Sequence, residues 1–186
     1  MKFVFSNFKD LNNAMRVCKK CKLCDTRQNV VYGEGDENAD LMLIAEAPGY
    51  YEDKIGKPFV GKAGDIINEA LNQNTLSRED IFISNIIKCH PPGNRNPEED
   101  EIKVCLDYLR NQVLLLKPKV VLLLGSIASK CILGEEYFIS RCRGKVINKK
   151  GIKYIPTWHP AAVLRDERKK NDFLIDFKLA VEESKK

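Results

Sequence analysis

Residues 40–49 read DLMLIAEAPG, an apolar run that is followed at once by a carboxylate and a turn. Such a run, without the alternation of a half-exposed strand, is typical of a strand that is buried on both faces of a parallel sheet. Pro48 and Gly49 end the run, because both residues favour turns. The stretch therefore predicts a central strand with Glu46 at its carboxyl end.

Three further runs of this kind lie downstream, and segments with helical spacing separate them. The further strands are expected at 81–84, 119–124 and 154–157, and helices are expected at 8–17, 63–71, 96–116, 125–131 and 171–183. Strands that alternate with helices favour a parallel sheet with helices on both faces. We therefore expect an α/β fold, a three-layer α/β/α sandwich with a central four-stranded parallel sheet.

Two details of this prediction concern the ends of elements. Asn96 is expected to cap the long helix, because Pro97 and two acidic residues follow it, and all of these favour a helix N-terminus. Residues 143–153 are expected to form a polar hairpin with residues 149–151 at its tip.

The composition is that of a soluble globular chain. Of its 186 residues, 44% are hydrophobic and 31% are charged, which excludes a collagen, a coiled coil and a disordered tail. The first ten residues lack the pattern of a signal peptide and no long apolar run occurs, so we expect no membrane contact and a cytoplasmic location. The chain shows no repeat or linker, so we expect a single domain over residues 1–186. The net charge of +5 permits a polyanionic partner without requiring one.

The carboxyl ends of the predicted strands carry three side chains that could bind and activate a substrate. Glu46, Asn85 and His159 each follow a strand, and Gly125 and Ser126 follow the remaining one. The carboxyl ends of parallel strands meet at one edge of the sheet. An amide can read a nucleobase edge, an imidazole can donate to a developing oxyanion, and a carboxylate can hold a water. Each residue alone has an ordinary structural interpretation, but together they predict a hydrolytic or base-reading pocket.

A glycine-rich loop supplies a second feature of this pocket. Phe59 lies between glycines in the segment 56–61, GKPFVG, where a flat side chain can stack on a base; a position in the core is the alternative. Gly61 and Gly64 would let the backbone approach a phosphate at the start of the next helix. Two glycines at this spacing are weak evidence by themselves.

The seven cysteines point to a metal or to redox chemistry rather than to disulfides. Cys18, Cys21 and Cys24 are clustered, Cys89 follows the second strand, and Cys105 begins the apolar face of the long helix. Four thiolates hold either a zinc ion or an iron–sulfur cluster, and the spacing does not separate the two metals. Cys24 competes as a candidate ligand, whereas Cys131 and Cys142 are expected to be plain core or surface thiols.

Six motifs occur in order along the chain and together resemble one family. They are CKKCKLCDTR (18–27), VYGEG (31–35), EAPGYYED (46–53), GKPFVGKAG (56–64), SNIIKCHPPGNR (84–95) and HPAAVLR (159–165). In this order they resemble the family 4 uracil-DNA glycosylases, thermostable-type enzymes that carry a 4Fe–4S cluster. The chain departs from the family pattern at Ala45 and Ala161, where the family usually has Gly and Ser, and in its extra thiol, Cys24.

The resemblance implies a role for each matching position. The implied metal ligands are Cys18, Cys21, Cys89 and Cys105. The implied substrate-binding residues are Ala47, Glu52 near uracil C5, Phe59 stacked on the flipped uracil, and Asn85 at its Watson–Crick edge. The implied catalytic residues are Glu46, which positions the attacking water, and His159, which contacts uracil O2. The residues expected near the DNA are Gly61, Gly64, Arg95 and Arg165.

The function that the resemblance implies is uracil excision from DNA. The enzyme would flip uracil out of single- or double-stranded DNA and hydrolyse its N-glycosidic bond, leaving an abasic site. The cluster would be structural, since it would tie the N-terminal segment to the loop after the second strand. We expect a monomer, and a sliding clamp is a candidate partner, although the sequence contains no convincing clamp-binding motif.

Three other interpretations stay open on the sequence alone. A relative that binds uracil-DNA covalently would need a histidine in a basic insertion; His90 lies near that place, but the insertion is absent. A family 5-like enzyme with broader substrates would lack the carboxylate at Glu46. A non-catalytic DNA-binding module with zinc or an iron–sulfur cluster would explain the charge and the thiols, but not the three polar side chains at the strand ends.

Overall fold

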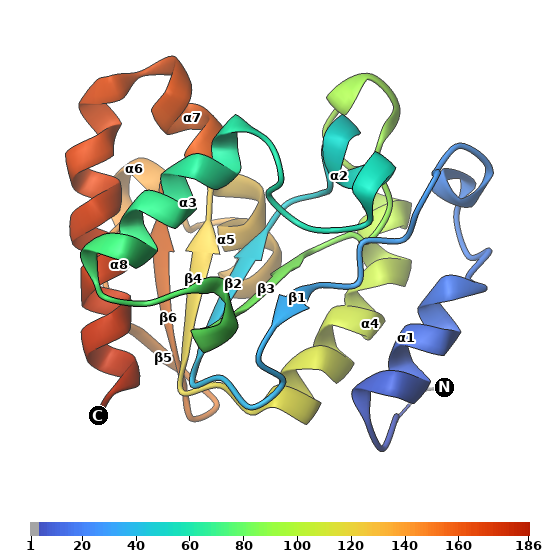
Figure 1. Ribbon diagram of the computed structural model, residues 1–186, viewed down its shortest axis with the longest axis horizontal. Coiled ribbons are helices and arrows are strands. Elements are labelled where there is room, and N and C mark those ends of the chain that lie inside the picture. The colour runs from blue at the N-terminus through green and yellow to red at the C-terminus, as the bar shows by residue number, and fades with distance from the viewer. Residues whose placement is uncertain (1–3) are drawn as a thin grey trace.

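Four parallel strands form the centre of the sheet in the computed structural model, which describes residues 4–186 (Figure 1). The sheet order is β1-β3-β2-β4-β6-β5, and the two outer strands pair antiparallel with their neighbours. The strands are β1 (Glu34–Gly35), β2 (Leu41–Ala45), β3 (Phe82–Asn85), β4 (Val120–Leu124), β5 (Ile147–Lys149) and β6 (Ile152–Thr157). The parallel centre confirms the predicted core of the fold, whereas the full sheet has six strands.

Helices cover both faces of this sheet. The α-helices of the described residues are α1 (Phe8–Arg16), α2 (Tyr50–Ile55), α3 (Lys62–Gln73), α4 (Glu99–Leu116), α5 (Ser126–Leu133), α6 (Ile139–Cys142), α7 (Pro160–Arg165) and α8 (Lys170–Ser184). Figure 1 shows α3 in front of the strands and α5 behind them. The three-layer α/β/α prediction is confirmed.

The strands are apolar along their whole length because each face packs on a different helical layer. Successive side chains of a strand point to opposite faces. Leu43 and Leu122 therefore pack with the core of α3 and α8, and Met42 and Val121 pack with the core of α4 and α5. All five residues of β2 are buried, as a central strand between two layers requires.

The N-terminal helix packs outside the second layer. Leu11 and Met15 of α1 are fully buried against Tyr108 of α4. The contact places the end of α1, and the cysteines that follow it, beside the middle of the long helix. Among the described residues, no helix has the length and apolar character needed to cross a lipid bilayer.

Two predicted element ends are wrong. The cap of α4 is Glu98 and not Asn96: Glu98 forms a capping box with Glu101, in which each side chain accepts from the backbone N–H of the other residue. The predicted hairpin exists, but its second arm is the start of β6 and not a separate strand, because Ile152 and Lys153 continue directly into the parallel centre.

The order of the strands defines where a site can form. The chain passes from β2 to its neighbour β3 and then crosses to β4 on the other side of β2. Such a reversal leaves a crevice at the carboxyl ends of the strands, where ligands of open α/β sheets bind.

Candidate active site and cysteine-lined cavity

A cavity of about 780 Å³ opens at this reversal, and the predicted strand-end residues line it together. The predicted residues in its wall are Glu46, Ala47, Glu52, Phe59, Asn85, Arg95, His159 and Arg165. Apart from the predicted metal ligands, two predicted site residues do not line this cavity: Gly61 and Gly64.

Glu46 and Asn85 offer unpaired polar groups to this cavity. They follow β2 and β3, whose last residues are paired in the sheet through Ala45 and Asn85. Asn85 is only 2% exposed, and within residues 4–186 neither its side-chain amide nor the Glu46 carboxylate makes a hydrogen bond with another protein group. Burial raises the pKa of the Glu46 carboxyl above its ordinary value. A buried amide and a half-buried carboxylate that lack protein partners are suited to bind polar groups of a ligand.

His159 is held in one orientation at the start of α7. Its Nδ1 accepts a hydrogen bond of 3.1 Å from the backbone N–H of Ala161. Burial lowers the pKa of His159 to about 4, and the positive charge of Arg165 makes a smaller contribution in the same direction. The ring is therefore neutral at physiological pH, its proton lies on Nε2, and Nε2–H is free to donate.

Gly125 makes room for this imidazole. It follows β4 with φ +94°, and a Cβ atom there would lie 2.9 Å from Cβ of His159. A larger residue at the end of β4 would displace His159.

Phe59 lies beside His159 in the cavity. The centroids of the two rings are 5.9 Å apart and their planes are inclined by 34°. Phe59 is 7% exposed and also packs in the core between the sheet and α3. The core position and the pocket position that the sequence suggested therefore coincide.

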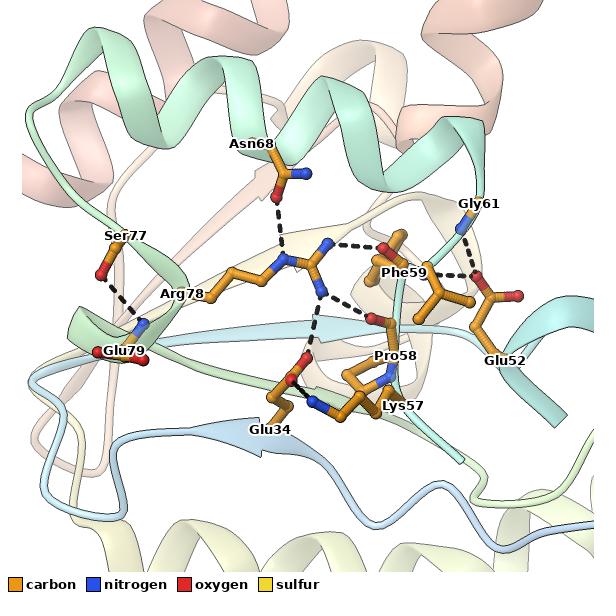
Figure 2. Close-up of polar contacts among 11 residues, drawn as sticks. Glu34, Glu52, Lys57, Pro58, Phe59, Gly61, Asn68, Ser77, Arg78 and Glu79 are labelled. Carbon is orange, nitrogen blue, oxygen red and sulfur yellow. Dashed lines mark hydrogen bonds and ion pairs between the residues drawn. The ribbon is translucent and has the colours of Figure 1, made fainter. Parts of the chain in front are cut away.

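Glu52 of α2 connects the cavity wall to the loop that carries Phe59 (Figure 2). Its Oε1 accepts hydrogen bonds from the backbone N–H groups of Val60, at 2.9 Å, and Gly61, at 3.2 Å. The Gly61 N–H is thus engaged inside the protein. At Gly64 a Cβ atom would lie 1.8 Å from the carbonyl oxygen of Phe59, so this glycine is required by the loop itself. The predicted phosphate contacts of both glycines stay predictions.

The two arginines of the cavity wall differ in their partners. Arg95 donates to both carboxylate oxygens of Glu101, at 2.9 Å and 2.6 Å, and Glu101 is 1% exposed. This ion pair neutralises much of the Arg95 charge and fixes the loop before α4. Arg165 makes no ion pair with any of the described residues, and its charge contributes to the lowered pKa of His159.

The other histidine lies outside this cavity. Nδ1–H of His90 donates a hydrogen bond of 2.9 Å to the carbonyl of Pro48. It therefore joins the loop after β3 to the turn after β2.

Sequence reasoning missed part of the cavity wall. The additional lining residues include Ile127, Lys130, Ile139, Trp158 and Lys169. Ser126, which the sequence places at a strand end, also lines the cavity, and the same proximity to a strand end could have identified Trp158. Nothing in the pattern marks Ile139, because it reaches the site from α6, a one-turn helix that the sequence does not predict.

A second, smaller cavity is lined by the four predicted metal ligands together with Cys24. Cys18 and Cys21 come from the segment after α1, Cys89 from the loop after β3 and Cys105 from α4. Among the described residues, no group of three His, Cys, Asp or Glu side chains is arranged to hold a single metal ion. Four of the thiols that line this cavity, from three segments of the chain, match the four-cysteine ligand set of an iron–sulfur cluster.

Positive groups lie against these thiols. The Arg27 guanidinium donates to Sγ of Cys89 at 3.3 Å and to the carbonyl of Cys18 at 2.9 Å. Lys88 is 1% exposed, and burial lowers its pKa to about 8. Its ammonium donates to the carbonyl of Asn85 at 2.6 Å. These cations suit an anionic thiolate cluster, and Lys88 also links the cysteine cavity to the strand end that carries Asn85.

Comparison with known proteins identifies the superfamily of this chain. Residues 32–179 match the family model described as the uracil DNA glycosylase superfamily. The chain is 43% identical to the type-4 uracil-DNA glycosylase of Sulfurisphaera tokodaii, over 87% of this chain and 77% of that protein. It is 45% identical to the type-4 enzyme of Saccharolobus solfataricus, over 81% and 74% of the two chains, and 40% identical to that of Archaeoglobus fulgidus, over 91% and 89%. The chain belongs to the type-4 uracil-DNA glycosylase family, which confirms the resemblance of its motifs.

Proposed function

We propose that the protein is a DNA repair glycosylase that flips uracil out of DNA and hydrolyses its N-glycosidic bond, releasing free uracil and leaving an abasic site. The observation that carries this proposal is the convergence of Glu46, Asn85 and His159, whose free polar groups face one cavity beside Phe59. A base cannot be reached inside a duplex, so the cavity receives it only after extrusion, which costs least at a mismatch or in a single strand.

Asn85 selects the base in this mechanism. Its amide can donate to O4 and accept from N3–H of uracil, whereas cytosine presents a donor in place of O4. A buried donor that is left unpaired costs roughly 1–3 kcal/mol. Phe59 stacks on the flipped ring, and Glu52 forms part of the wall near C5, where a thymine methyl group would have to fit.

His159 and Glu46 act on the opposite charges that develop on uracil and on the sugar as the bond breaks. Negative charge develops on uracil as the bond breaks, and the neutral imidazole donates from Nε2–H to O2 without giving up its proton. The Glu46 carboxylate orients the water that adds to the sugar carbon, and its charge also favours the developing positive charge on the sugar.

The cysteine cavity has a structural part in this proposal. Cys18, Cys21, Cys89 and Cys105 would hold a 4Fe–4S cluster, and four iron–thiolate bonds would join three segments of the chain. The side chain of Cys24 donates to Asp25 instead, at 3.3 Å, which supports leaving it out of the ligand set. The proposal also includes a single domain over residues 1–186, a monomeric state and a cytoplasmic location. It includes a sliding clamp as a candidate partner and DNA contacts from four residues: Gly61, Gly64, Arg95 and Arg165.

A uracil-release assay tests the proposal directly. Purified protein is incubated with single-stranded and duplex oligonucleotides that contain one uracil, and with matched oligonucleotides that contain thymine or cytosine. We expect free uracil and an alkali-labile abasic site from the uracil substrates only. DNA binding without base release would instead support a non-catalytic DNA-binding module, and a protein–DNA adduct that survives denaturation would support the covalent binder.

A further inference from the structure

The backbone of Phe59 is held from one side by an arginine that lies outside the cavity. Nη2 of Arg78 donates to the carbonyl of Phe59 at 2.6 Å, and Nη1 donates to the carbonyl of Pro58 at 3.0 Å (Figure 2). Arg78 belongs to the short 3₁₀ helix η2 (Arg78–Asp80) that precedes β3. One planar guanidinium thus holds two successive peptide carbonyls of the loop.

Two side chains hold the guanidinium itself. Nε of Arg78 donates to Oδ1 of Asn68 at 2.9 Å, and Nη1 also lies 3.2 Å from Oε2 of Glu34. The same carboxylate pairs with Lys57 of the loop at 2.8 Å. Arg78 is therefore fixed by α3 and β1, the two elements on either side of it.

The opposite side of the same loop is held by Glu52. Its carboxylate accepts from the next two peptide N–H groups, those of Val60 and Gly61. Arg78 thus binds the carbonyls of Pro58 and Phe59, and Glu52 binds the next two N–H groups. Together they fix four consecutive residues, Pro58 to Gly61. Figure 2 shows the two contacts on either side of Phe59.

The conformation that is held in this way carries strain. Phe59 has φ +52°, in the left-handed region that a residue with a side chain rarely occupies. Its carbonyl also lies so close to α3 that only a glycine fits at Gly64. Strained backbone persists when surrounding contacts over-determine it, and the Arg78 contacts supply that constraint.

We propose that Arg78 is a positioning residue for base binding: it holds Phe59 in the left-handed conformation that directs the phenyl ring into the cavity beside His159. The inference rests on the proposed function. It adds a residue of the 3₁₀ helix to the determinants of uracil affinity, although that residue lines neither cavity.

Product inhibition measures this role separately from DNA contacts. Arg78→Gln removes the ion pair and the two carbonyl contacts, because the shorter glutamine side chain ends at about the position of the arginine Nε. We expect the inhibition constant for free uracil to rise roughly tenfold or more, since hydrogen bonds to charged groups are typically worth a tenfold or larger change. Affinity for uracil-free DNA should stay unchanged, and Arg78→Lys should recover part of the loss. Arg110→Gln, which removes an exposed ion pair with Asp107 on α4, is the matched control and should change neither constant.

A double variant tests whether Arg78 acts through Phe59. In a Phe59→Ala background, Arg78→Gln should add little to the loss of uracil affinity, because the ring that Arg78 positions is gone. Equal losses in the two backgrounds, or an unchanged inhibition constant in Arg78→Gln, would overturn the proposal.

Amide hydrogen exchange separates failure of this inference from failure of the proposed function. The Val60 and Gly61 N–H groups are protected by Glu52 only while the loop keeps its conformation. We expect Arg78→Gln to speed exchange across residues 56–64 and to leave β4 unchanged, whether or not the protein releases uracil. Exchange that is unaltered in 56–64 would show that Arg78 does not hold the loop, even in an active glycosylase.

Discussion

The backbone N–H of Ala161 donates a hydrogen bond to Nδ1 of His159. A nitrogen that accepts a hydrogen bond carries no proton, so the neutral ring must present its N–H from Nε2, which lies on the side away from the helix N-terminus. The lowered pKa of His159, about 4, agrees with this assignment. The site thus contains a fixed neutral donor and, in Glu46, a carboxylate whose pKa is raised by burial.

The pH dependence of the chemical step should therefore belong to Glu46. The carboxylate is active when ionised, so the single-turnover rate should rise with pH through a pKa above the ordinary glutamate value and then stay level. His159 becomes charged only near pH 4, so no transition is expected near pH 6.5. Glu46→Gln should lower the rate, abolish the acid limb and preserve DNA binding. Persistence of that limb in Glu46→Gln would assign it to another group, and a parallel loss of DNA binding would indicate a structural role.

The two histidines of the chain provide a matched pair of variants. His159→Ala should lower the single-turnover rate about 10²–10³-fold, the usual effect of losing one preorganised donor to a developing oxyanion, while uracil-DNA still binds. His90→Ala should keep the rate within a few-fold, because its hydrogen bond goes to the carbonyl of Pro48 and not into the cavity. An inactive His90→Ala together with an active His159→Ala would overturn the site and favour the covalent binder.

Asn85 should decide which base is released. Asn85→Ala removes both the donor and the acceptor at the Watson–Crick edge and should slow uracil release strongly. Asn85→Asp exchanges the donor for an acceptor, which suits the amino group of cytosine, so weak cytosine release is expected. Release rates from matched uracil and cytosine oligonucleotides measure both effects. A uracil rate that is unchanged in Asn85→Ala would place base recognition elsewhere.

The site residues that could be predicted from the sequence are those that directly follow a recognisable strand pattern. Glu46 and Asn85 end apolar runs, and the parallel arrangement alone brings such ends together. Arg78 follows no such pattern. It lies 19 residues from Phe59 in the chain, on a short 3₁₀ turn, and only the folded chain shows which carbonyls it reaches.

Edge strands and helix caps were difficult for the same reason. β1 contains only Glu34 and Gly35, too few residues for any alternation, and it exists because β3 offers it an unpaired edge. The start of α4 was predicted from Asn96 and Pro97, each a good local signal, but the ion pair of Arg95 with the buried Glu101 draws the cap to Glu98. Tertiary contacts overrode local preference at both places.

The cysteines allow the cofactor to be tested one thiol at a time. The purified protein should be brown and contain about four irons per chain, the content of one four-cysteine cluster.

Ala substitution of Cys18, Cys21, Cys89 or Cys105 should remove the colour, and it should also reduce solubility, because the segment after α1 would lose its bonds to β3 and α4. Cys24→Ala, Cys131→Ala and Cys142→Ala should keep both iron and colour, since Cys24 contacts Asp25 and the other two thiols lie outside the cysteine cavity. Metal analysis of each variant, with thermal unfolding as a check on folding, distinguishes the outcomes. A colourless native protein with one zinc would contradict the iron–sulfur assignment, and loss of iron in Cys24→Ala alone would place Cys24 in the ligand set.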